Sequence, residues 1–279
     1  LGRDVSISQK PQRVIILDYN ALDLWYHAGG TAVGRTGHIL VDSRADEDEM
    51  GSEIKNVPIM NEAHDPVNIE MIVAQEPDLI IISPTNKTHL EAVESFEQYN
   101  IPYFAWDYDD FDGFIENLEL FTLLNDRGDL YEKYASDNII RVNAVREKIS
   151  GQEPVTMVML LPHATNGIYA LANSGYLGNL CEDMNLENIA GVETSTVVSI
   201  ESLLDIDPEW IFSRGGSGDG SEANAKAIFE SYPLWSELTA VKEGRFQHLP
   251  AELFLYHANT RYADAYEYLA NLVYPQIFN

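Results

Sequence analysis

Residues 68–83, NIEMIVAQEPDLIIIS, share their pattern with residues 199–214, SIESLLDIDPEWIFSR, without a gap. Each copy begins with a residue suited to a helix N-cap, Asn68 or Ser199, and has a Glu two positions later. A Pro followed by an acid ends the helix, and the short apolar run after it predicts a strand buried on both faces. A chain that builds this helix–strand unit twice is expected to have two similar lobes, with a ligand in the cleft between them.

The remaining sequence favours the α/β fold class. Strand-like apolar runs alternate with helical patterns up to residue 106 and again after residue 155, which predicts mainly parallel sheets. Residues 111–150 contain no Pro and carry apolar residues at helical spacing. We therefore expect an N-terminal α/β lobe over residues 1–125, a connecting helix over 126–150 and a C-terminal α/β lobe over 151–279.

Shorter patterns complete the expected secondary structure. Early strands are predicted at residues 13–17 and 31–34, and a helix that runs to Gly29 is predicted between them. Loops are predicted at residues 18–20, 42–51, 58–60 and 162–167, of which the acid-rich 42–51 is typical of a solvated loop.

The composition limits the partners. Forty-five acids against 17 Lys and Arg give a net charge of −28, which argues against binding to nucleic acid or to an anionic membrane surface. The single cysteine, Cys181, excludes an internal disulfide, and it is expected to be buried. The sequence contains no apolar run long enough to span a bilayer and no charged-then-apolar leader segment. Leu1 is not Met, which is typical of a trimmed or mature chain, and the sequence leaves open whether a secretion signal or lipid anchor preceded it.

Several motifs along nearly the whole chain resemble periplasmic-type substrate-binding proteins for iron complexes, haem and cobalamin. They are LGRDV at 1–5, PQRVIIL at 11–17, the two repeated units, GYLG at 175–178, ENIA at 187–190, WSEL at 235–238, VKEGR at 241–245 and YLANLVYP at 268–275. The resemblance implies a class III protein, in which two Rossmann-like lobes are joined by one long helix and hold the ligand between them. It also implies an extracytoplasmic monomer, in the periplasm or lipid-anchored, that serves an ABC importer.

The same resemblance gives roles to Glu70 and Glu201. In the family, one acid on each lobe docks onto arginines of the permease dimer. The alternative is that each carboxylate only stabilises its helix through the helix dipole.

Ligands of parallel α/β sheets bind at the carboxyl ends of the strands, and several residues are expected there. Arg214 is the first candidate, because it follows a buried strand, enters a glycine-rich loop and suits a carboxylate or catecholate oxygen. The alternative is a salt bridge from Arg214 to a nearby acid. The other ligand candidates are Arg35 and the aromatic or polar side chains Tyr19, Trp106, Tyr108, His163, Tyr256 and His257.

Met60 is a candidate by resemblance, because some haem-binding members of the family use a Met or Tyr in this region as an axial ligand. His163 or His257 would then supply the second ligand. The alternatives are packing for Met60 and ordinary hydrogen bonding for the histidines.

The predicted function is capture of an iron complex, a ferric siderophore first, and its delivery to an ABC importer. A haem-binding protein of the same family and an α/β enzyme acting on a metal complex are the alternatives. No nucleophile elbow or phosphate-binding loop is present, so we expect no catalytic residues, no enzyme activity and no intrinsic cofactor.

Overall fold

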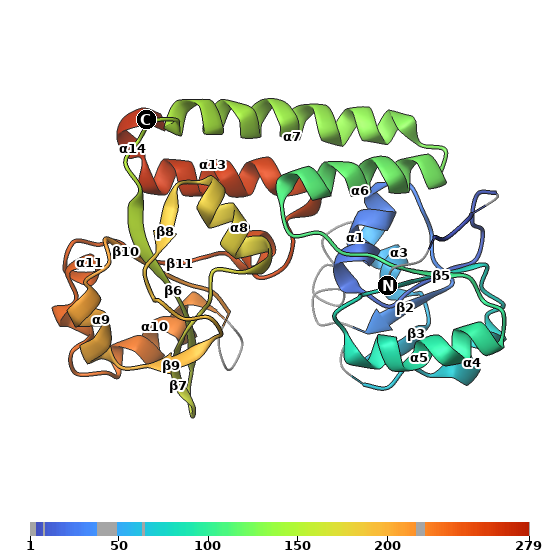
Figure 1. The fold of residues 1–279 in the computed structure, drawn as a ribbon, viewed down its shortest axis with the longest axis horizontal. Coiled ribbons are helices and arrows are strands. Elements are labelled where there is room, and N and C mark those ends of the chain that lie inside the picture. Colours follow the sequence, from blue (N-terminus) through green and yellow to red (C-terminus); the bar gives the residue numbers. More distant parts are fainter. Residues whose placement is uncertain (1–3, 8, 38–48, 63–64, 216–220, 279) are drawn as a thin grey trace. The chain divides into compact units, whose positions relative to one another are not determined.

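The chain divides into two units (Figure 1). The computed structural model describes residues 4–7, 9–37, 49–62, 65–215 and 221–278. Unit 1 comprises Leu1–Tyr108 and Asp112–Ser136, and unit 2 comprises Asp109–Phe111 and Asp137–Asn279. The main division therefore falls inside the segment 126–150 that the sequence assigns to a connecting helix.

Unit 1 contains one parallel sheet with the strand order β3-β2-β1-β4-β5. Ile15 of the central strand lies opposite Gly34 on one side and Ile80 on the other. All its strand pairs are parallel, so the carboxyl ends of these strands share one edge. The elements are β1 (Val14–Ile16), α1 (Tyr19–His27), β2 (Gly34–Gly37), α3 (Glu49–Lys55), β3 (Ile59–Glu62), α4 (Ile69–Ala74), β4 (Leu79–Ile82), α5 (Lys87–Gln98) and β5 (Tyr103–Ala105).

Helices cover both faces of this sheet (Figure 1). On one face, Ile72 of α4 and Phe96 of α5 pack with Ile80 of β4 in a buried cluster. On the other face, Trp25 of α1 meets Phe121 of α6 (Phe111–Leu124) edge to face, with ring centroids 5.2 Å apart. Because helices cover both faces of the sheet, side chains on both sides of each strand are buried, and the sequences of β1 and β4 are unbroken apolar runs.

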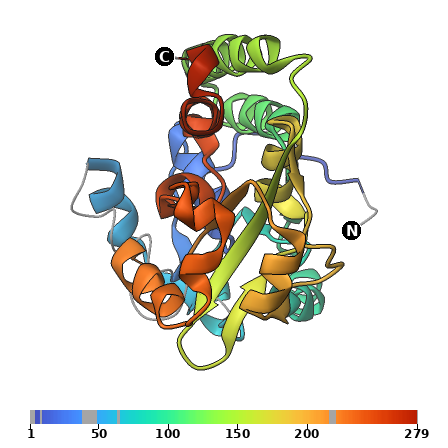
Figure 2. The same cartoon turned by 90° about the vertical axis from the view of Figure 1, so that its left-hand side faces the viewer.

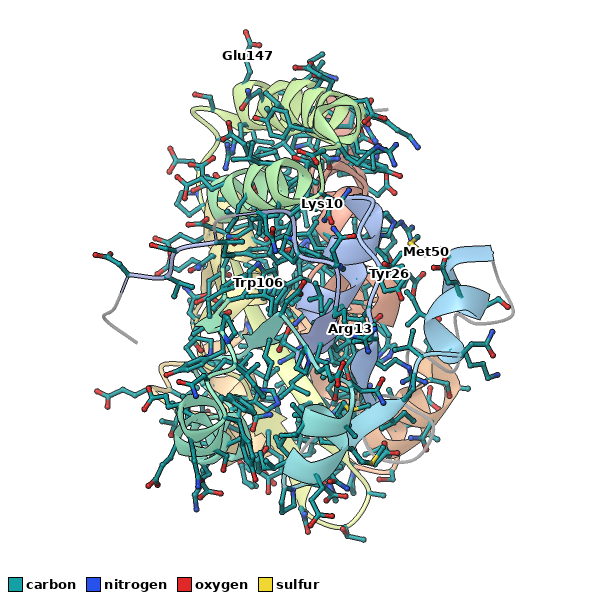
Figure 3. All side chains as sticks on the ribbon, turned by 90° about the vertical axis from the view of Figure 1, so that its right-hand side faces the viewer. Lys10, Arg13, Tyr26, Met50, Trp106 and Glu147 are labelled. Carbon is teal, nitrogen blue, oxygen red and sulfur yellow. The ribbon has the colours of Figure 1, made fainter. Side chains whose placement is uncertain are left out.

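Helix α6 is followed by a tight turn and then by α7 (Gly128–Ile149), which has 22 residues. Asp126 has a left-handed φ of 55° in the turn. The Lys10 amine donates a hydrogen bond to the Asn125 carbonyl at 2.7 Å, which satisfies an acceptor at the end of α6 (Figure 3). Gly128 is the first residue of α7, so the break between the helices lies just before it.

Unit 2 contains a mixed sheet with the strand order β11-β10-β6-β7-β9, and β8 also pairs with β6. β10 is parallel to β6 and β11, whereas β6, β7 and β9 form antiparallel pairs. Figure 2 shows the long strand β6 leading into its hairpin with β7. The elements are β6 (Val155–His163), β7 (Gly167–Ala170), α8 (Gly175–Asp183), β8 (Leu186–Asn188), β9 (Thr196–Val198), α9 (Ile200–Ile206), β10 (Trp210–Ser213), α10 (Glu222–Glu230), the 3-10 helix η1 (Trp235–Glu237), α11 (Thr239–Lys242), β11 (Phe246–His248), α12 (Ala251–Phe254), the 3-10 helix η2 (Asn259–Arg261), α13 (Tyr262–Val273) and α14 (Pro275–Phe278).

The core of unit 2 is also layered. Leu203 of α9 and Phe229 of α10 pack with Ile211 of β10 on one face of the sheet. Elsewhere in the unit, α13 lies along the later part of α7 (Figure 1), where Arg141 forms ion pairs with Asp264 at 2.7 Å and Glu267 at 2.6 Å. The α/β class predicted from the sequence is confirmed, with the qualification that the second sheet is mixed.

The repeated segments form equivalent structures. The side chains of Asn68 and Ser199 accept hydrogen bonds from backbone N–H groups in the first turns of α4 and α9, which confirms both as N-caps. Glu76 and Asp207 stand directly before the two prolines, and both have left-handed backbones, with φ of 47° and 40°. The buried strands β4 and β10 then follow.

Five local predictions are wrong. The second strand covers Gly34–Gly37 instead of residues 31–34, and Tyr19 belongs to α1 because Asp18 caps that helix. Residues 59–60 lie in β3, and β6 continues through His163. Of the predicted loop at 42–51, residues 49–51 begin α3, and residues 42–48 lie outside the described residues.

Candidate functional site

A cavity of about 70 Å³ lies in unit 2 between helix α8 and strand β6. Met157 and Met159 line it from β6, and Leu177 and Cys181 line it from α8. Arg214, directly after β10, also lines it. Burial raises the pKa of the Cys181 thiol to about 12, so this residue is a neutral, apolar part of the wall.

Arg214 is a half-buried cation. Its Nη1 donates a hydrogen bond to the Leu255 carbonyl at 3.2 Å, and its buried Nε has no hydrogen-bond partner in the described part of the chain. It also forms no ion pair with a described acid, which removes the salt-bridge alternative for those residues. Desolvation lowers the pKa of the guanidinium, but a guanidinium remains charged in proteins. Such a group suits an anionic oxygen.

Tyr256 and His257 lie next to the backbone carbonyl that holds Arg214. Desolvation raises the pKa of the Tyr256 phenol, although the nearby Arg214 charge opposes this shift. Burial lowers the pKa of His257 to about 4, and its ring contacts Tyr176 with centroids 5.2 Å apart. At neutral pH Tyr256 and His257 are therefore uncharged. The structure thus brings together three of the predicted ligand residues.

The start of helix α8 contributes backbone to the same cavity. Its N-cap, Ser174, lines the cavity and makes no side-chain capping hydrogen bond. A Cβ atom at Gly178 would lie 2.8 Å from the carbonyl carbon of Asn173, so glycine is needed for this close approach. The sequence analysis did not identify these residues, because their role depends on packing between segments.

Trp106 and Tyr108 are interior side chains of unit 1, with exposed fractions of 3% and 6%. Trp106 stacks on Phe121 of α6 with centroids 5.8 Å apart, and Tyr108 meets Trp106 edge to face. Figure 3 shows Trp106 among the side chains of unit 1. Both side chains pack against α6, and their role in stacking on a ligand stays a prediction.

Arg35 and Met60 are also buried within unit 1. Arg35 is 2% exposed in β2, and its Nη1 donates to the Thr36 carbonyl at 2.9 Å. Met60 is 1% exposed in β3, in the cluster with Ile15 and Ile72, and it contacts the backbone at Gly34. Both residues are therefore part of the interior of unit 1, which agrees with the packing alternative for Met60, and their ligand roles stay predictions.

The carboxyl edge of the unit 1 sheet is acidic. Tyr19 is half-buried in the first turn of α1, and the Asp18 carboxylate accepts the Ala21 N–H at 2.9 Å. Burial, with a smaller contribution from the charge of Asp107, raises the pKa of Asp18 to about 6. Asp18 was expected in a loop with Tyr19 and was not recognised as a helix cap, although an acid between a buried strand and a helix is a recognisable N-cap signal.

His163 lies at the end of β6, where its ring faces the hairpin turn. The Asn166 backbone N–H donates to His163 Nδ1 at 3.2 Å, and the Thr165 N–H approaches the same atom at 3.4 Å. This agrees with the ordinary hydrogen-bonding alternative, and a ligand role for His163 stays a prediction.

Glu70 and Glu201 occupy the same position in the two repeated helices, two residues after the cap. Both side chains are exposed, and neither forms an ion pair with a described residue. Both are thus available to a cationic partner. Their helices are short, so a dipole effect of about 0.3–1 kcal/mol remains the alternative reason for each acid.

The described residues contain neither a metal-ligand cluster nor a membrane-spanning helix. No group of three or more His, Cys, Asp or Glu side chains there is arranged to hold a metal ion. No described helix combines the length and apolar character needed to cross a membrane.

Comparison with known proteins identifies the fold and its relatives. The model of the family described as "periplasmic binding protein" matches residues 14–253. The chain belongs to this family. Its members include substrate-binding proteins of ABC transporters, as the motif resemblance predicted.

Two curated proteins and one solved structure are similar to this chain. The chain is 25% identical over 229 residues to the vitamin B12-binding protein of Vibrio campbellii, covering 80% of this chain and 79% of that one. It is 24% identical over 252 residues to the Fe(3+)-citrate-binding protein of Bacillus subtilis, covering 86% and 73%. The structure of the ABC-type Fe3+-hydroxamate transport system from Saccharomonospora viridis has a TM-score of 0.73 at 21% identity, with 98% and 97% covered. This last likeness concerns the fold alone. The class III α/β architecture is thereby confirmed.

Proposed function

We propose that this periplasmic binding protein captures an anionic iron complex, with a ferric siderophore as the first choice, and delivers it to an ABC importer. The observation that carries the proposal is Arg214, a half-buried guanidinium on a cavity wall that has no acidic partner among the described residues. In a chain with a net charge of −28, a cation held in this way favours recognition of carboxylate or catecholate oxygens.

The named ligands of the relatives support an iron complex. One relative binds ferric citrate and one solved structure belongs to a ferric hydroxamate transport system. The cavity of about 70 Å³ has room for only part of such a ligand, so we assign it to one anionic or hydroxyl group. Tyr256, beside Arg214, supplies a neutral phenol that donates a hydrogen bond to the same group.

A haem ligand is the second candidate, and His257 is the observation that favours it. Its pKa of about 4 keeps the imidazole neutral at pH 7, which is the form that binds haem iron. Met60 is buried in unit 1, so we do not propose it as the axial partner. Haem binding would produce a strong visible absorption band on titration with haemin, and the His257→Ala substitution would alter that band.

The proposal places the protein outside the cytoplasm, as a monomer in the periplasm or on a lipid anchor. The family supports this location, and another relative is a putative substrate-binding lipoprotein of Bacillus subtilis. We further propose that Glu70 and Glu201 dock onto arginines of the permease dimer. The Glu70→Lys/Glu201→Lys double variant should abolish uptake in cells and leave ligand affinity unchanged. Uptake that survives this double reversal would contradict the docking role.

The ligand site is tested by fluorescence titration with ferric citrate, a ferric hydroxamate and a ferric catecholate. We expect one of these complexes to quench tryptophan emission, and the Arg214→Ala variant to bind it at least tenfold more weakly, about 1.4 kcal/mol. Arg127→Gln is the matched control, because Arg127 is a surface arginine paired with Asp129 at 2.7 Å. Equal affinities of the wild type and Arg214→Ala would contradict the proposed site. Mass spectrometry of the same mixtures should recover the complex unchanged, as expected of a binding protein.

A further inference from the structure

A second hollow in unit 2 lies beside Glu201. It has a volume of about 330 Å³ and is lined by Ser199, Ile200, Glu201, Tyr232, Pro233 and Leu234. The first three residues form the N-terminus of α9, and the other three form the segment between α10 and η1. An exposed carboxylate therefore stands on the rim of a hollow whose opposite wall is mostly apolar.

The wall of this hollow is fixed by the core beneath it. Trp235, which follows Leu234, is 4% exposed and stacks on Phe229 with centroids 4.5 Å apart. The Trp235 N–H donates to the Tyr232 carbonyl at 3.0 Å, and the Tyr232 N–H donates to the Phe229 carbonyl at 3.1 Å. The hollow is thus formed before any partner binds, which lowers the entropic cost of binding.

Two apolar residues that line this hollow are exposed. Pro233 and Leu234 are exposed, and Leu234 exposes 36% of its surface. Leu234 stands near a carboxylate that forms no ion pair with a described residue. An apolar contact beside an unpaired charge is typical of an interface at which a buried anchor is surrounded by polar contacts.

We propose that this hollow receives an apolar side chain of the permease, next to the arginine that pairs with Glu201. The inference rests on the proposed docking function and adds a second, uncharged contact to it. The proposed docking function makes the permease the occupant, and charge complementarity agrees with it: the net charge of −28 favours a cationic partner segment and opposes an anionic membrane surface. The arginine would set orientation, and the apolar side chain would slow dissociation.

The test measures affinity of the intact protein for its ABC importer in lipid nanodiscs, together with stimulation of ATP hydrolysis. Leu234→Ser should weaken binding about five- to tenfold, and Leu234→Met should stay within about twofold of the wild type. Val197→Ser is the matched control, because Val197 is an exposed apolar residue of the same unit (51% exposed) that does not line the hollow. Val197→Ser should leave binding unchanged.

Salt separates the two contacts. The loss caused by Glu201→Lys should shrink at 0.5 M NaCl, whereas the loss caused by Leu234→Ser should persist, because apolar contacts are not screened. If Leu234→Ser lowers the melting temperature, Leu234→Trp replaces it and should also weaken binding by blocking the hollow. Wild-type affinity of both Leu234 variants, with Glu201→Lys impaired, would overturn this inference and leave docking intact. Wild-type affinity of Glu201→Lys would instead overturn the docking function itself.

Discussion

Residues 68–83 in unit 1 and residues 199–214 in unit 2 are built alike up to their last residue. Each copy has a capped helix, an exposed glutamate, a left-handed residue before Pro and a buried strand. Each also has an acid after Pro that binds the backbone at the first strand of its unit. Asp78 accepts from the Gln12 and Arg13 N–H groups at 2.7 and 2.9 Å, and Glu209 accepts from the Thr156 N–H at 2.9 Å.

The copies differ where the strand ends. Ser83 is 7% exposed, and its N–H donates to His89 Nδ1 at 3.1 Å, so this end is closed within the fold. Arg214 is the equivalent residue in unit 2, and this charged side chain lines the cavity. The carboxyl edge of unit 1 instead carries the acid Asp18. The shared helix–strand unit therefore places a side chain at the carboxyl end of the strand in both units. The type of residue at that place determines whether the end is closed or offers a charge to a ligand.

The largest effect is expected from the buried strands, where Ile80 and Ile211 are equivalent and both 0% exposed. Replacing either by Ala should lower the free energy of unfolding by about 2–5 kcal/mol, through lost burial and a cavity. Urea unfolding followed by circular dichroism measures this loss. Leu123→Ala, at a side chain that is 73% exposed, is the control. A small loss at only one of the two isoleucines would break the equivalence of the copies.

Asp18→Asn tests the difference between the two sheet edges. Burial raises the pKa of Asp18 from 3.8 to about 6, so ionisation of the carboxylate costs stability as the pH rises through this range. Asparagine keeps the helix cap without the charge. The variant should match the wild type near pH 4 and exceed it above pH 7 by at most about 3 kcal/mol. Thermal melts across this pH range measure the gain, and a pH-independent difference would contradict the burial of the charge.

The acids after the prolines should give a smaller and unequal effect. Asp78→Ala removes two backbone contacts and should cost about 1–2 kcal/mol, whereas Glu209→Ala removes one and should cost about 0.5–1 kcal/mol. Asp78→Asn, which keeps one acceptor, should fall between them. Chemical denaturation ranks the three variants, and a larger loss at Glu209 would reverse the predicted order.

An effect similar in size to that of Glu209→Ala is expected at the two N-caps. Asn68 and Ser199 accept from Met71 N and Ser202 N at 3.0 and 3.1 Å, so their alanine variants should each lose about 1 kcal/mol. Asp at either position should retain the wild-type stability in the same denaturation measurement. Unequal losses at the two sites would show that the copies are not capped alike.

Sequence predicted the features that depend on local chemistry. The caps Asn68 and Ser199 and the buried strands beyond the prolines follow from residue type and spacing alone. The family resemblance rested on motifs in the correct order, and it supplied the class III architecture. The sequence also allowed the proximity of Arg214 and Tyr256 to be predicted, because both residues were expected at the carboxyl ends of strands.

The sequence was least informative where tertiary contacts decide whether a side chain is buried. The sequence is compatible with Trp106 as a rim aromatic or as a core residue. The packing of Phe121 against Trp106 shows that it is a core residue. Met60 follows Pro58 in a short, partly polar segment, so periodicity did not reveal that it belongs to a strand. Arg35 lies in the polar strand GRTG, whose burial depends on distant elements. The cavity beside α8 required the approach of Asn173 to Gly178, which sequence spacing does not show.

The most direct test of the central claim is native mass spectrometry of the intact chain after incubation with an equimolar mixture of ferric citrate, a ferric hydroxamate, a ferric catecholate, haemin and cyanocobalamin. The account predicts a monomer that retains one ferric siderophore or ferric citrate, with the bound fraction lost in Arg214→Ala and kept in Arg127→Gln. Retention of haemin or cyanocobalamin in preference to the ferric chelates, or equal retention by Arg214→Ala, would contradict it.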